Sequence, residues 1–78
     1  MNIAYKVCLV IWSDATSYPG WSGEDAVEDV ELALCATAGF KVFEDAEKIV
    51  LAATIKEDGE FGDLYVIPVC SVLSRKEL

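Results

Sequence analysis

Apolar side chains recur at every second position along most of this chain, which is the spacing of β-strands. The first such stretch covers residues 3–12, where the odd-numbered positions are all apolar or aromatic. From Cys8 onward the even-numbered positions are apolar as well. Because successive side chains of a strand point to opposite faces, we expect this strand to be covered on both faces or to lie at a seam between copies of the chain.

Further strands follow, separated by residues typical of sharp turns. The pattern predicts strands over residues 31–43, 48–56, 64–67 and 72–74, turns at 44–47 and 57–60, and a 3₁₀ turn over 69–71. Asp58-Gly59 marks a tight hairpin, and Gly39 inside the longest strand predicts a bend or bulge. We therefore expect an all-β fold, a small five-stranded SH3-like barrel that occupies residues 1–78 as one domain.

A different pattern separates the first two strands. Residues 13–21 are dense in turn-forming residues and predict a long loop. Ser22 and Asp25 then have the spacing of a capping box, with Ser22 at the N-cap, and predict a helix of only one or two turns. This helix is acidic throughout and has one apolar side formed by Ala26, Val27 and Val30.

The chain is apolar for its length, with 54% hydrophobic residues, and its net charge is −8. A domain this small buries only about 60% of its unfolded surface, so we expect excess apolar surface to be covered in a homo-oligomer. The negative charge disfavours nonspecific nucleic-acid binding. Residues 7–12 are too few to span a bilayer, no leader is recognisable at the N-terminus, and no contact with a membrane is expected. The expected location is the cytoplasm.

Enzymatic chemistry finds little support in the residues. The chain has no histidine, which excludes Ser-His-Asp and Cys-His sites, and no metal-binding or cofactor motif is present. Cys8, Cys35 and Cys70 are widely separated and are expected in the core of a protein from a reducing compartment. We therefore expect no metal, no cofactor and no enzymatic activity.

The loop between the two tryptophans is the best candidate for a ligand site. Aromatic side chains stack on nucleobases, and hydroxyls and carboxylates bind ribose or phosphate groups. The alternative is that both tryptophans pack over the end of the barrel and that Asp14 caps amides of its own loop. An anionic ligand would also need a cation. The candidate ligand-binding residues are Trp12, Asp14, Thr16, Ser17 and Trp21, together with Lys41 and Arg75.

Several short motifs together resemble a group of small bacteriophage accessory proteins with an SH3-like or Sm-like barrel. The motifs are Trp12-Ser13-Asp14-Ala15, Gly20-Trp21, Ala38-Gly39-Phe40, Val50-Leu51-Ala52, Gly59 and Ile67-Pro68. The resemblance implies a phage accessory protein in the cytoplasm of a bacterial host. Because small phage proteins often act against host defence, it also implies a sponge for a nucleotide-derived immune signal.

Three functions are therefore compared. The first is a non-enzymatic binder that sequesters a small nucleotide-like ligand. The second is an acidic protein-interaction module that inhibits a basic host protein through Glu24, Asp25, Glu28, Asp29 and Glu31. The third is a structural phage protein whose barrel oligomerises.

Overall fold

A computed structural model describes all residues, 1–78, and shows five antiparallel strands in one sheet. The all-β fold class is confirmed. The elements in chain order are β1 (Val7–Asp14), η1 (Glu24–Asp29), β2 (Ala33–Glu44), β3 (Lys48–Ile55), β4 (Phe61–Pro68), η2 (Val69–Ser71) and β5 (Val72–Glu77). Both helical elements are 3₁₀ turns, and neither is long and apolar enough to cross a membrane.

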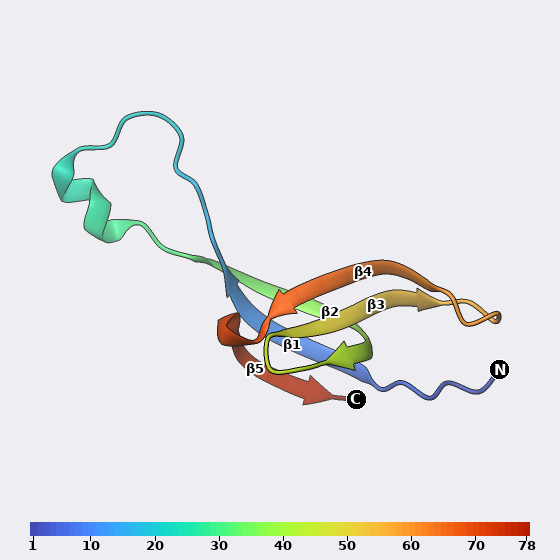
Figure 1. The fold of residues 1–78 in the computed structure, drawn as a ribbon. Helices are drawn as coiled ribbons and strands as arrows, with labels where there is room; N and C mark the ends of the chain where they lie inside the picture. The colour runs from blue at the N-terminus through green and yellow to red at the C-terminus, as the bar shows by residue number, and fades with distance from the viewer.

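The strand order across the sheet is β4-β3-β2-β1-β5 (Figure 1). Strands β2, β3 and β4 form a meander, and η2 then carries the chain across so that β5 pairs with β1. The order of elements along the chain, with three meandering strands and a 3₁₀ turn before the last strand, is as predicted. Strands β4 and β5 are the two edges of the sheet.

The strand boundaries differ from prediction where a partner strand decides them. Strand β1 begins at Val7 rather than at residue 3, because pairing with β2 starts at Val7 and Phe40. Strand β4 begins at Phe61, opposite Ile55, three residues before the predicted start. Strand β5 continues past its predicted end at residue 74 to Glu77, because Glu77 still pairs with Cys8 of β1.

Strand β2 carries the predicted irregularity. A Cβ atom on Gly39 would lie 2.8 Å from the Ala52 carbonyl oxygen and 3.2 Å from the Leu51 Cβ, so glycine permits close approach of β3. The register then shifts between Lys41 and Phe43, which marks a bulge. Residues 33–40 of β2 pair with β1 and residues 40–44 pair with β3, so the irregularity lies where the strand passes from one partner to the other.

The two predicted turns are held by aspartates. In the hairpin after β3, Gly59 has φ +94°, and the Asp58 carboxylate accepts a hydrogen bond from the Glu60 N–H at 3.0 Å. In the turn before β3, the Asp45 carboxylate accepts from the N–H groups of Glu47 and Lys48 at 2.8 and 2.9 Å. These two backbone donors hold the pKa of Asp45 below its usual value.

The predicted capping box does not form. The N-cap of η1 is Gly23 rather than Ser22, and no side chain caps the helix. The helix is also 3₁₀ throughout its six residues, so it has fewer unpaired amide groups for a cap to satisfy than an α-helix. Its short length is as predicted.

The core is small, and β3 is buried on both faces from Ile49 to Ala52. Only seven of the 78 residues are buried, and five of them form one cluster, against which Trp12, Val69 and Val72 pack. The clustered residues are Cys8, Val10, Ile49, Leu51 and Ile67. The cysteine prediction is confirmed for Cys8 but is wrong for Cys70, which is exposed; Cys35 is half-buried.

Candidate functional site

The connection between β1 and β2 forms a long arm that projects away from the sheet (Figure 1). We define the arm as residues 15–32. Every residue of the arm is exposed to solvent, as is Asp14 before it. The arm makes the molecule elongated, with principal extents of 56 × 22 × 20 Å. A connection of this length without a packed core of its own is uncommon in small domains and is usually functional.

Hydrogen bonds at the base of the arm hold its two chain segments together. The Thr16 hydroxyl donates to the Glu31 carbonyl oxygen at 2.7 Å. The Tyr18 hydroxyl donates to the same oxygen at 3.2 Å and accepts from the Glu31 N–H at 3.1 Å. These bonds fix the direction in which the arm leaves the sheet. Beyond them lies η1, whose residues are all exposed.

The arm concentrates the negative charge of the chain. It contains five acidic residues and no basic residue, whereas all six lysines and arginines lie on the rest of the chain. None of these five carboxylates forms an ion pair within the chain. They are the predicted protein-interaction residues Glu24, Asp25, Glu28, Asp29 and Glu31, four of them in η1. The structure therefore gathers this set on one projecting element.

Apolar side chains accompany these carboxylates. The Trp21 side chain is 104% exposed, which means that nothing in its own chain covers it. Tyr18, Val27 and Val30 are 54%, 58% and 42% exposed. An exposed indole beside further exposed apolar groups is a feature of surfaces that bind other molecules.

The predicted aromatic pair is not brought together. Trp12 belongs to β1, packs against the core, and its indole N–H donates to the Thr37 hydroxyl at 3.0 Å. Trp21 lies on the arm, away from the sheet. Asp14 accepts a hydrogen bond from the Ala15 N–H at 2.8 Å, as the alternative interpretation expected. Ser17 is exposed on the arm.

The two predicted cations lie close together but are already paired. The Lys41 ammonium is 3.2 Å from one Glu44 oxygen, and Arg75 contacts the other at 2.6 Å. Glu44 and then Glu77 raise the pKa of Lys41, and Arg75 and then Lys41 lower the pKa of the Glu44 carboxyl. An anionic ligand would have to compete with these carboxylates. Sequence reasoning named both cations but not Glu44 between them.

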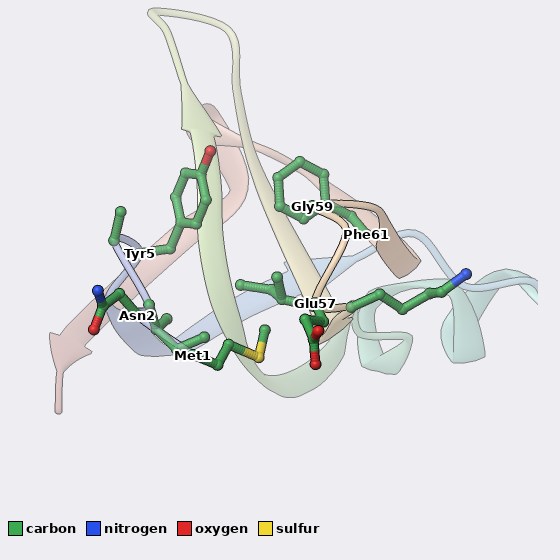
Figure 2. A pocket seen from close by; sticks show the side chains of 10 residues that line it. Met1, Asn2, Tyr5, Glu57, Gly59 and Phe61 are labelled. Carbon is green, nitrogen blue, oxygen red and sulfur yellow. The ribbon is translucent and has the colours of Figure 1, made fainter.

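Two shallow pockets occur. The first, of about 270 Å³, lies at the base of the arm and is lined by Ala15, Thr16, Tyr18, Val30, Glu31 and Leu32. The second, of about 260 Å³, lies between the N-terminal segment and the β3–β4 hairpin (Figure 2). There Tyr5 and Phe61 meet edge to face with ring centroids 5.4 Å apart. Sequence reasoning missed the second pocket, because residues 3–6 were predicted as strand.

No group of three or more Cys, Asp or Glu side chains converges as a set of metal ligands. Comparisons with family models, curated proteins and solved structures found no match to this chain.

Proposed function

We propose that this protein is a non-enzymatic protein-interaction module that binds a basic partner protein through its arm. One observation carries the proposal: the arm extends from the sheet with an uncovered tryptophan and five unpaired carboxylates. None of these groups stabilises the rest of the fold through an ion pair or a buried contact. Their arrangement is therefore free to serve another molecule.

The two kinds of side chain have separate roles in this proposal. Tryptophan buries a large surface on binding and is enriched among the residues that dominate binding energy. The carboxylates attract a positively charged partner from a distance and set its orientation, which affects association rate and specificity more than affinity. A target with an apolar pocket surrounded by Lys and Arg residues is the chemical complement of this surface. The resemblance to phage accessory proteins suggests a bacterial host protein as that target.

Charge reversal at two locations tests the proposal. In the arm variant, Glu24→Lys and Glu28→Lys reverse two carboxylates of η1. In the matched control, Glu47→Lys and Glu57→Lys make the same change of charge at exposed positions of the body that form no ion pair. The tagged proteins are used to capture partners from bacterial lysate, and the captured proteins are quantified by mass spectrometry.

We expect a basic protein to be captured by the wild type and by the control but not by the arm variant. A Trp21→Ala variant should weaken the same capture without changing net charge. If the arm variant and the control capture the same proteins in equal amounts, the arm is not the binding element and the proposal fails.

A nucleotide-like ligand is the second candidate, supported by the pocket at the base of the arm. An exposed Tyr18 ring and the predicted residue Thr16 line this pocket, and an aromatic face can stack on a base. Thr16 already donates to Glu31, however, so ring stacking would have to supply most of the affinity. Calorimetric titration with cyclic and ADP-ribose-derived nucleotides tests this candidate. Binding that Tyr18→Ala abolishes would support it, and no heat across the panel would remove it.

A further inference from the structure

The molecule exposes more surface than a folded monomer of its mass. Its accessible surface is 5990 Å² for 8.5 kDa, whereas the usual relation for monomers gives roughly 4,700 Å². The excess of roughly 1,300 Å² is larger than the roughly 800 Å² that each partner buries in a standard protein interface. The arm supplies part of it. Eleven of the sixteen exposed large hydrophobic side chains lie outside the arm, among them Leu34 of β2.

One face of the central strand pair is apolar and is partly exposed to solvent. In β1 the even-numbered Cys8 and Val10 are buried in the core, so the odd-numbered residues point to the opposite face. The register places each of these beside an even-numbered residue of β2. We call this surface the β1–β2 outer face; it consists of Val7, Leu9, Ile11, Leu34, Ala36, Ala38 and Phe40. Leu34 is 73% exposed, and Ala36 and Ala38 are also exposed, whereas the other four residues of the face are half-buried.

This face is also uncharged. Neither residues 7–13 nor residues 33–40 contain an ionisable acid or base other than cysteine. The nearest charge along the ladder is Lys76 of β5, which lies opposite Leu9 at the border of the face. Two copies that each carry a net charge of −8 repel one another. They can approach most easily through a neutral surface that keeps the acidic arms apart.

We propose that the β1–β2 outer face is a self-association surface that packs against the same face of a second copy. The face has the relief that such a contact needs, because Leu9 and Ile11 of β1 stand beside Ala38 and Ala36 of β2. A two-fold axis sets the larger side chains of each copy over the small residues of the other. Two sheets packed in this way lie about 10 Å apart and enclose an apolar layer, as in a β-sandwich.

The inference does not depend on the proposed partner of the arm. The arm leaves the sheet at the ends of β1 and β2 and is not part of the outer face. The dimer would therefore display two acidic arms, and a partner with two binding sites would be held by both. Loss of dimerisation and loss of partner capture are separate results.

Lysine substitutions on the face test the inference by light scattering coupled to size-exclusion chromatography. We expect the wild type to have at least twice the 8.5 kDa mass of the chain at micromolar concentration. The double variant Ala36→Lys and Ala38→Lys should have the monomer mass, because it places cations in the apolar layer while lowering the net negative charge. Ala46→Lys, in the exposed turn before β3, is the control for a single added lysine and should keep the wild-type mass.

Two further variants make the result decisive. Leu34→Lys changes a largely exposed side chain near the start of β2. Circular dichroism should show that this variant is folded, and light scattering should give the monomer mass, even if the double variant does not fold. Trp21→Ala should leave the mass unchanged. The inference is overturned if the wild type is monomeric or if Leu34→Lys retains the wild-type mass. It is also overturned if Trp21→Ala dissociates the protein, because that result would assign the contact to the arm.

Discussion

Replacement of Gly39 by alanine tests whether β2 and β3 approach as closely as the structure shows. The added Cβ would lie 2.8 Å from the Ala52 carbonyl oxygen, whereas close C···O contacts between strands are usually about 3.3–3.6 Å. The two strands would have to separate by roughly 0.5 Å to restore that distance. Ala52 is fully buried and its neighbour Leu51 belongs to the core cluster, so the displacement would disturb the core as well.

We expect Gly39→Ala to lower the free energy of unfolding by about 1–3 kcal/mol, the usual cost of overpacking. For a domain of this size, each kcal/mol shifts the melting temperature by about 4–8 °C. Gly62→Ala is the matched control, since Gly62 lies on the edge strand β4 and its added Cβ would lie at an ordinary 3.5 Å from the Thr54 Cβ of β3. Urea unfolding at one fixed protein concentration measures both. Equal midpoints for the two variants would refute the close approach at Gly39.

Two other predictions concern charge and thiol exposure. The folded state lowers the pKa of Glu44 through Arg75 and Lys41, so the ionised carboxylate stabilises the fold at neutral pH and this contribution is lost as the pH falls. Glu44→Gln should therefore reduce the fall in the free energy of unfolding between about pH 6 and pH 3. A fall as steep as in the wild type would contradict the pairing. A thiol reagent added to the native protein should label the exposed Cys70 rapidly and the buried Cys8 only after unfolding; rapid labelling of both would contradict the described core.

The sequence predicted those elements whose cause is local. Alternation located the strands, and Asp58-Gly59 located the hairpin because only a few residues adopt its backbone angles. The extension of β5 through Arg75, Lys76 and Glu77 was missed, since charged residues have little strand preference and the pairing is provided by β1. The late start of β1 has the same origin, because apolar alternation cannot show where the partner strand ends.

Residues of the candidate site were predictable in kind but not in arrangement. Acidic residues without basic neighbours in the sequence predicted an exposed helical turn, and the structure places that turn on the arm. The separation of Trp12 from Trp21 depends on β1 continuing to Asp14, which carries Trp12 into the sheet. The meeting of Lys41 and Arg75 at Glu44 depends on the order and register of three strands, which no local pattern specifies.

The two tryptophans provide a direct test of whether the arm is exposed, because Trp12 packs against the core and Trp21 is uncovered. Trp21→Phe leaves only Trp12, which packs against the core, and should emit at short wavelength with little quenching by acrylamide. Trp12→Phe leaves only Trp21 and should emit like indole in water with strong quenching. This second variant also leaves the Thr37 hydroxyl without its donor, at a cost of about 1 kcal/mol, so circular dichroism must first show that it is folded.

A captured partner should shift only the Trp21 emission to shorter wavelength, since only that indole has uncovered surface to lose. Weak quenching of Trp21 in the free protein would show that its indole is covered, and the protein would then lack the exposed element on which the proposed binding depends.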